Sequence, residues 1–187
     1  MRITISGLPG SGTTTVAKLL STELSLELIS AGEMFRQIAE EKKLQLEQFN
    51  KLAENNDDFD RQIDARQGEE AMKRENVIVE GRLSGFFVSD ADLKIWLKAP
   101  VEIRARRIAG REKIAYEEAL SAVKSRERSE NKRYKEYYGI NLDDLSIYDL
   151  VIDSSRWRER DIVEMILVAK ERVNLREQVS GFRFQGF

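Results

Sequence analysis

The chain of 187 residues contains no cysteine and no histidine. Without cysteine it can form no disulfide bond, thiolate zinc site or thiol nucleophile, and without histidine it has no imidazole for acid–base catalysis. Any chemistry must therefore depend on carboxylates, arginine, lysine, hydroxyl groups and the backbone.

Long apolar runs and a strong net charge are also missing. No stretch of about eighteen consecutive apolar residues occurs, and no signal-peptide core follows Met1, so we expect a cytoplasmic protein with no membrane partner. A net charge of -2 with 34% charged residues fits a globular protein without a nucleic-acid partner. The length suits one core, and we expect a monomer.

The small net charge conceals an uneven distribution of charge along the chain. Residues 101–135 hold eleven Lys or Arg against six Glu, whereas residues 33–75 hold twelve acidic and eight basic residues. We expect phosphate contacts in the basic segment.

A glycine-rich segment is the most specific motif. It follows a β-branched run at residues 1–6 and precedes a helical pattern at residues 14–24. Gly7 to Thr14 matches G-x-x-x-x-G-K-[ST] except at the lysine, where Thr13 stands, and the alternative is a tight turn with a threonine cap. The expected ATP-binding residues are Gly7, Leu8, Pro9, Gly10, Ser11, Gly12, Thr13, Thr14 and Thr15. Thr14 or Thr15 can offer a hydroxyl to Mg²⁺.

Four further apolar runs, at residues 26–29, 77–80, 93–97 and 148–152, alternate with helical patterns. This alternation predicts an α/β fold, a P-loop NTPase-type three-layer α/β/α arrangement around a five-stranded parallel sheet, with ligands at the carboxyl ends of the strands. Residues 32–74 contain no strand pattern, and a turn at 55–58 predicts two or more helices that form a flap. A second helical stretch, 101–135, is expected to be interrupted near Gly110.

Two polar groups follow predicted strands. Ser30 can cap the helix after residues 26–29, and Arg36, one turn inside that helix, can reach an anion. Glu80, at the end of a strand expected beside the first, is a candidate for organising Mg²⁺, while Gly81 permits close approach and Arg82 can bind a phosphate. The alternatives are a solvated Arg36 and a simple Glu80–Arg82 pair.

Two arginine clusters lie in the basic segment. Arg107 and Arg111 are four residues apart, and Arg126, Glu130 and Arg133 share one helical face. Solvated helices with i,i+4 ion pairs would show the same pattern. Because phosphoryl transfer needs charge neutralisation and alignment, arginines on such segments could also replace the missing lysine.

Together these motifs resemble the nucleoside monophosphate kinases, and most specifically the archaeal-type cytidylate kinases, over about residues 1–173. The resembling segments are the loop with Thr13 in the lysine position, Ile29–Arg36, Val79–Arg82 and the two arginine clusters. The resemblance implies transfer of the ATP γ-phosphate to CMP or dCMP with Mg²⁺, in pyrimidine nucleotide metabolism. It implies a core (1–29, 76–105 and 114–173), an NMP-binding flap (about 30–75) and a short lid (about 106–113), with a tail at 174–187.

The resemblance also implies roles for single residues. Catalytic arginines would be Arg36, Arg82, Arg107, Arg111, Arg126 and Arg133. The acceptor would be bound by Ser30, Gly32, Arg36, Asp64, Gln67, Gly81, Arg82 and Glu130. The metal would be bound by Thr14 and Glu80.

Three other functions stay open at this point. The chain could phosphorylate another small acceptor, such as adenylate, uridylate or shikimate. It could bind ATP as a switch without transferring phosphate. An RNA-associated ATPase would depend on the arginines of residues 101–135 with neighbouring tyrosines.

Overall fold

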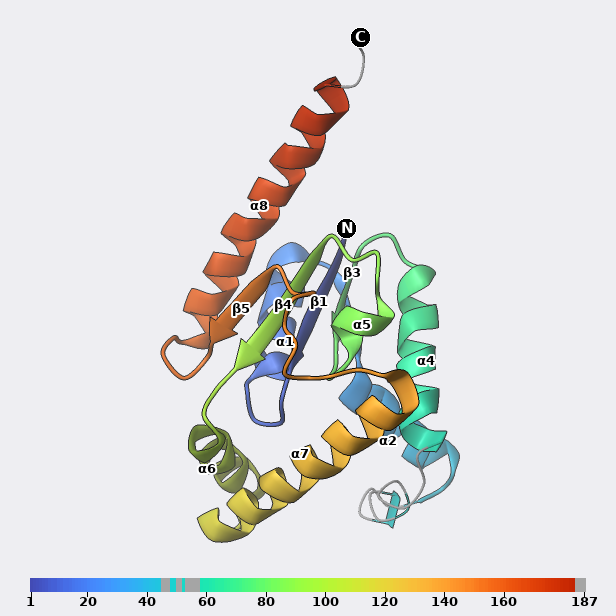
Figure 1. The fold of residues 1–187 in the computed structure, drawn as a ribbon, viewed down its shortest axis with the longest axis vertical. Helices are drawn as coiled ribbons and strands as arrows, with labels where there is room; N and C mark the ends of the chain where they lie inside the picture. Colours follow the sequence, from blue (N-terminus) through green and yellow to red (C-terminus); the bar gives the residue numbers. More distant parts are fainter. Residues whose placement is uncertain (45–47, 50–51, 53–57, 184–187) are drawn as a thin grey trace.

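The structure, a computed structural model, describes residues 1–44, 48–49, 52 and 58–183. Its central feature is a five-stranded, entirely parallel sheet in the order β2-β3-β1-β4-β5 (Figure 1). The strands are β1 (Arg2–Gly7), β2 (Glu27–Ser30), β3 (Val77–Glu80), β4 (Leu93–Lys98) and β5 (Leu150–Asp153). The predicted α/β fold and the parallel sheet are therefore confirmed.

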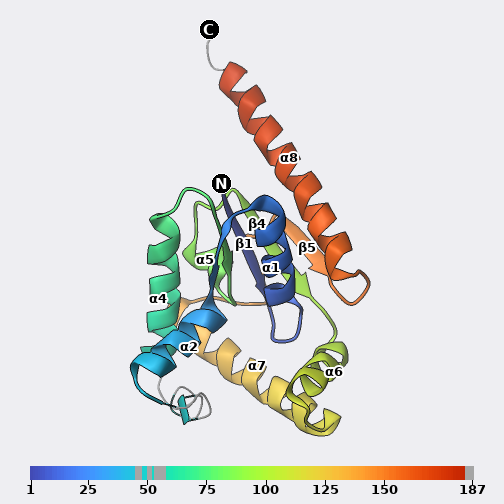
Figure 2. The same cartoon turned by 180° about the vertical axis from the view of Figure 1, so that it is seen from behind.

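Helices cover both faces of the sheet (Figures 1 and 2). The helices are α1 (Thr13–Leu24), α2 (Ala31–Glu41), α4 (Asp58–Met72), α5 (Ser84–Phe87), α6 (Val101–Glu112), α7 (Tyr116–Tyr138) and α8 (Glu159–Arg183). Strand residues alternate between the layers: Ile78 packs in the core with α1 and α8, whereas Val77 and Val79 pack with α2 and α4. This alternation gives the expected three layers.

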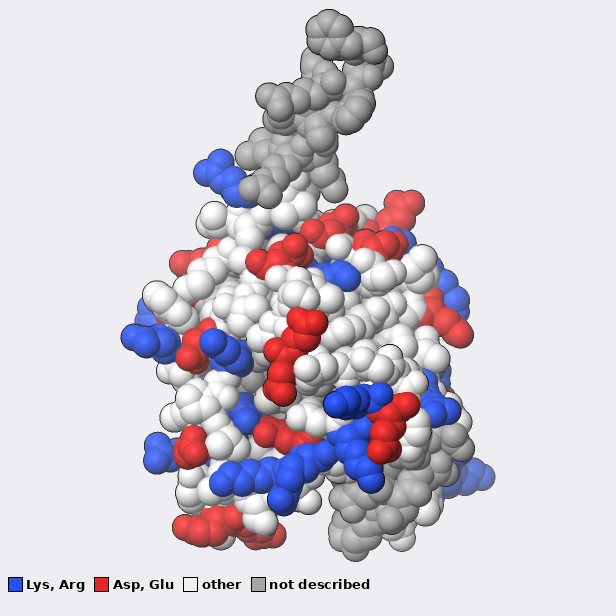
Figure 3. Space-filling view, viewed as in Figure 1, with Lys and Arg blue, Asp and Glu red and all other residues white. Residues whose placement is uncertain are grey.

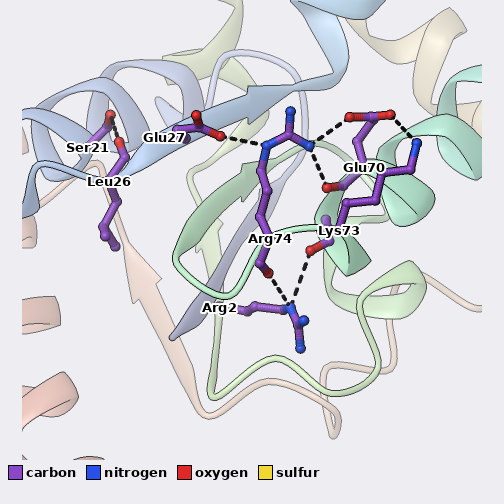
Figure 4. A network of polar contacts seen from close by, with 8 residues as sticks. Arg2, Ser21, Leu26, Glu27, Glu70, Lys73 and Arg74 are labelled. Carbon is purple, nitrogen blue, oxygen red and sulfur yellow. Dashed lines mark hydrogen bonds and ion pairs between the residues drawn. The ribbon is translucent and has the colours of Figure 1, made fainter.

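The carboxyl-terminal end of α4, in the segment expected to form the flap, is fixed to the amino-terminal edge of the sheet (Figure 4). Arg74 donates to the Glu27 carboxylate of β2 at 2.6 Å and to Glu70 of α4 at 2.7 Å. The Arg2 Nε of β1 donates to the Arg74 carbonyl at 2.9 Å. Hydrogen bonds from Lys73 and Arg74 lower the pKa of Glu70 to about 2.

Three local expectations need correction or lie outside the described residues. The interruption expected near Gly110 lies three residues later: α6 continues through Gly110 to Glu112, Lys113 ends it with a φ of 58°, and α7 begins at Tyr116. One glycine costs about 1 kcal/mol in a helix, which the packing of α6 on α7 offsets. Residues 55–57 of the predicted flap turn are not described. Helix α8 extends into the predicted tail as far as Arg183, and residues 184–187 lie outside the described range.

No helix in the described part of the chain is long and apolar enough to cross a membrane.

Candidate nucleotide phosphate site

The glycine-rich segment forms the loop between β1 and α1, at the carboxyl edge of the sheet. Gly10 has a φ of 81°, and a Cβ there would lie 2.7 Å from the Arg104 carbonyl oxygen. Only glycine fits both conditions. Helix α1 begins at Thr13, directly after Gly12, and no side chain caps its first turn. The backbone N–H groups of that turn therefore have no side-chain acceptor, as is typical of helix N-termini that bind anions.

Glu80 is the centre of the hydroxyl contacts around this loop. The Thr13 and Thr14 hydroxyls donate to its Oε1 at 2.7 and 3.2 Å, and the Ser30 hydroxyl donates to Oε2 at 2.7 Å. Glu80 is buried, whereas Thr15 lies exposed on α1. Of the two threonines considered for Mg²⁺, Thr14 is therefore the one beside the carboxylate.

The expected cap by Ser30 is wrong in its detail. Ser30 stands at the N-cap position of α2, but its side chain makes no capping hydrogen bond, because the hydroxyl donates to Glu80 instead. The alternative of a simple Glu80–Arg82 pair is not found, since Arg82 pairs with Glu130. Arg36 is 56% exposed on α2, with Glu33 at 3.9 Å, and Gly32 lies beside it and Ser30.

The structure gathers one of the two arginine clusters around a buried carboxylate. Glu130 on α7 is only 3% exposed; Arg82 pairs with its Oε2, and the Nε of Arg126 donates to its Oε1 at 2.7 Å. Burial alone would raise the pKa of Glu130, but Arg82, Arg126 and Arg133 lower it below the ordinary value. The carboxylate is therefore ionised and holds guanidinium groups from β3's end and α7 together.

Lys and Arg side chains gather over α7 on this face of the molecule (Figure 3). Arg133 also donates to Ser129 at 2.7 Å, and Arg126 stays 65% exposed, which leaves its guanidinium accessible to a ligand. The arginines around Glu130 thus place positive charge near the end of β3, because Arg82 is only two residues from Glu80.

The second cluster is divided by the structure. Arg107 of α6 lies on the phosphate-binding loop, where its Nη1 donates to the Gly10 carbonyl at 3.2 Å. Arg111 is 68% exposed and pairs with its neighbour Glu112, so the structure does not bring it to the loop. The two residues share α6 as predicted, but only Arg107 contacts the site in this conformation.

Asp64 and Gln67, both on the flap helix α4, are buried. The Gln67 Nε2 donates to the Glu80 carbonyl at 2.7 Å, and a Cβ on Gly81 would lie 2.8 Å from the Gln67 Oε1. The Tyr138 hydroxyl of α7 donates to Asp64 at 3.4 Å. The flap residues therefore lie against the end of β3, which is the side of the site expected to bind the acceptor.

Several residues that hold the site were not found from the sequence. Arg104 is 3% exposed, donates to the carbonyls of Ala99 and Pro9 at 2.8 and 3.2 Å, and pairs with Glu127 of α7. Ser154 follows β5 and donates to the Ser11 carbonyl at 2.6 Å. Its place directly after a strand was a usable signal, because β1, β2 and β3 also end in candidate site residues, at Gly7, Ser30 and Glu80.

The described residues contain no group of three or more carboxylates that could hold a metal by themselves. A hydroxyl and one carboxylate, from Thr14 and Glu80, are hard oxygen ligands that fit a Mg²⁺ ion which also takes phosphate oxygens and water. The donor set thus fits Mg²⁺ bound together with a nucleotide.

Comparison with known proteins agrees with this geometry. Residues 2–156 match the model of the cytidylate kinase-like family. Cytidylate kinases of Methanopyrus kandleri and Archaeoglobus fulgidus are 49% and 50% identical, over 94% and 91% of this chain and 95% of each relative. The cytidylate kinase of Methanosphaerula palustris is 54% identical over 84% of this chain and 90% of its own.

Solved structures show the same fold at low identity. A protein from Eubacterium ventriosum superposes with a TM-score of 0.68 at 19% identity, covering 90% of this chain and 97% of its own. Shikimate kinase from Aquifex aeolicus gives 0.57 at 17%, covering 94% and 99%. A gluconokinase from Sinorhizobium meliloti gives 0.61 at 16%, covering 95% and 96%.

Proposed function

This chain belongs to the cytidylate kinase-like family, and from that premise we propose that it transfers the γ-phosphate of ATP to CMP or dCMP, giving ADP and CDP or dCDP. It is a nucleoside monophosphate kinase. One observation carries the proposal: Glu80 contacts the threonines of the phosphate-binding loop, and Arg82, two residues on, joins the arginines around Glu130. Sites for two phosphate groups are therefore adjacent.

On the donor side, the loop backbone at Gly7 to Thr15 binds the ATP phosphates, and Arg107 of α6 contacts ATP above the loop. Thr14 and Glu80 would hold Mg²⁺, which would supply positive charge beside the transferred phosphate. Arg111 joins Arg107 when the lid segment closes over ATP.

On the acceptor side, Arg36 and Arg82 bind the monophosphate, and Ser30, Gly32 and Gly81 shape its entry. Asp64 and Gln67 of the flap contact the base or the ribose. Arg126 and Arg133 contact phosphates, whereas Glu130 orients Arg82 and Arg126.

During transfer, an oxygen of the acceptor phosphate forms a bond to the γ-phosphorus of ATP, and the bond from that phosphorus to the bridging oxygen of ADP breaks. The attacking oxygen is already anionic near neutral pH, so no general base is needed, which suits a protein without histidine. The arginines stabilise the charge on the transferred group and align the two phosphates. Closure of flap and lid excludes water and so limits hydrolysis of ATP.

A coupled assay of ADP release tests the function with CMP, dCMP, AMP, UMP, shikimate and gluconate as acceptors. We expect CMP or dCMP to give the highest kcat/KM. A higher value with another acceptor would refute the assignment, and tight ATP binding without transfer to any acceptor would indicate a nucleotide switch instead.

We also propose that the enzyme acts as a cytoplasmic monomer, because the loop threonines, Glu80 and the Arg82–Glu130 pair lie close together within one copy of the chain. Light scattering at the concentrations of the assay tests this, and a dimer that dissociates with loss of activity would contradict it.

A further inference from the structure

We propose that Ser154 is a positioning residue for ATP, whose hydroxyl holds the guanidinium of Arg107 against the phosphate-binding loop. This rests on the proposed function in one respect, namely that Arg107 contacts ATP. Ser154 lies outside the loop, the flap and the lid segment, in the connection between β5 and α8.

The position of Ser154 is fixed by the sheet. Ser154 is only 3% exposed. Its backbone N–H donates at 2.8 Å to the carbonyl of Lys98, at the end of β4. Ser154 therefore belongs to the rigid carboxyl edge of the sheet, while α6 and the loop both lie beside it.

The hydroxyl of Ser154 joins these two neighbours. It donates to the Ser11 carbonyl at 2.6 Å, and because a hydroxyl has one proton, its lone pairs remain to accept from Arg107 Nη1 at 3.0 Å. The Arg107 Nη2 donates to the Ser154 carbonyl at 2.7 Å, and Nη1 also reaches the Gly10 carbonyl at 3.2 Å. Two of the three acceptors around the guanidinium thus belong to Ser154.

This arrangement orders Arg107 before a nucleotide arrives. An arginine side chain at a largely exposed position has many rotamers, and fixing it during binding lowers affinity. Arg107 is exposed, yet hydrogen bonds to three acceptor atoms hold its guanidinium in one orientation. Removing the hydroxyl removes one of them and frees the Ser11 carbonyl at the same time.

A double-mutant cycle tests the proposal by calorimetric titration with a non-hydrolysable ATP analogue and Mg²⁺. We expect Ser154→Ala to weaken binding about tenfold in the wild-type background and less than about twofold when Arg107 is already alanine. An equal loss in both backgrounds would overturn the proposal, because Ser154 would then act through the loop alone.

Ser155→Ala is the matched control. Ser155 is the neighbouring serine, is exposed, and its hydroxyl donates to Asp153 at 2.6 Å without reaching Arg107 or the loop. We expect its affinity for the analogue to equal that of the wild type. A loss as large as that of Ser154→Ala would overturn the proposal, since any change in the connection would then have the same effect.

Steady-state kinetics separates positioning from general loosening of the fold. Ser154→Ala should raise KM for ATP about tenfold and leave KM for CMP within about twofold. A melting temperature that falls without a change in ATP affinity would overturn the proposal. If Ser154→Ala does not fold, Ser154→Cys, of similar size and with a weaker donor, enters the same cycle.

The binding measurement needs no acceptor. A chain that fails to phosphorylate CMP but shows the expected coupling between Ser154 and Arg107 would refute the proposed acceptor and support the positioning role.

Discussion

Thr13 removes a positive charge from the phosphate-binding loop. Its hydroxyl donates to Glu80 at 2.7 Å, and within the part of the chain that the structure describes no lysine or arginine pairs with Glu80. In the proposed site, the charge of the phosphates is balanced by Mg²⁺, by Arg82 and by arginines of α2, α6 and α7. Thr13 thus contributes a hydrogen bond where other loops of this kind contribute a cation.

Thr13→Val should therefore leave measurable turnover. Loss of one hydrogen bond to a carboxylate predicts a fall in kcat of about tenfold, whereas Arg126→Ala should lower kcat by about a hundredfold or more. Both values come from the coupled assay at saturating ATP and CMP. The opposite ranking would show that the Thr13 hydroxyl handles the charge of the transferred group.

The two acceptor arginines should behave differently when each is replaced by alanine. Arg36→Ala should raise KM for CMP by a factor that corresponds to about 2 kcal/mol, leave the Kd of ATP nearly unchanged, and leave the melting temperature unchanged because Arg36 is 56% exposed.

Arg82→Ala should weaken CMP binding by a similar factor, and it should also lower the free energy of unfolding by about 3 kcal/mol, because the buried Glu130 loses one partner. Steady-state kinetics and denaturant unfolding measure the two effects. Equal losses for ATP and CMP in either variant would contradict the acceptor roles.

Helix α6 is attached to the loop between β1 and α1. Arg104 lies within this helix, donates to the Pro9 carbonyl at 3.2 Å and pairs with Glu127 of α7. Both partners are largely buried, at 4% and 19% exposure of their side chains. Arg104 therefore connects the loop, α6 and α7, in addition to the apolar packing of α6 on α7.

Glu127→Ala tests the connection that Arg104 makes between the loop, α6 and α7. It leaves the buried Arg104 without its carboxylate, so we expect the free energy of unfolding to fall by about 3 kcal/mol and KM for ATP to rise. Glu136→Ala is the control, because Glu136 forms an exposed pair with Lys132 on the same helix and should change stability by about 0.5 kcal/mol or less. A smaller effect from Glu127→Ala than from the control would show that the pair is dispensable.

The periodicity of the sequence was enough to predict the parallel sheet. Strand β3 was expected at residues 77–80 beside β1 and is found there, because Val77 to Val79 are apolar on both faces, as in a buried parallel strand. Strand β5 begins at Leu150 and not at Tyr148, whose ring packs on Trp96 instead. Local patterns cannot show such packing between distant residues.

The site was predictable where a residue follows a strand and unpredictable where its partner comes from another element. Glu80 and Arg82 could be named from their place after β3, but the pairing of Arg82 with Glu130 joins residues 48 positions apart. The Arg107–Ser154 contacts join residues 47 apart. A charged helix gives the same sequence pattern whether its arginines are solvated or bonded, so only the fold distinguishes Arg107 from Arg111.

The stability of the whole protein should fall in acid but should change little around neutral pH. The pKa values of Glu130, Glu70, Asp144 and Asp161 are lowered in the folded protein, so their stabilising contribution is present above their ordinary pKa values, near 4, and is lost as the pH falls through the folded values.

With no histidine in the chain, we expect the free energy of unfolding to stay nearly constant between about pH 6 and 8 and to fall below about pH 4.5. Urea unfolding across this range measures it, and Glu130→Gln should reduce the acid dependence. A steep change between pH 6 and 8 would contradict the assignment to carboxylates.

Helix α7 places Glu127, Glu130, Tyr134 and Tyr138 along one face, at spacings of three and four residues. Glu127 contacts the arginine that holds the ATP loop, and Tyr138, about 16 Å further along, contacts Asp64 of the flap. A rigid helix cannot tilt at one of these points without displacing the other. The two sites proposed for the substrates are therefore joined by one helix, and any coupling of the two affinities through it must be mutual.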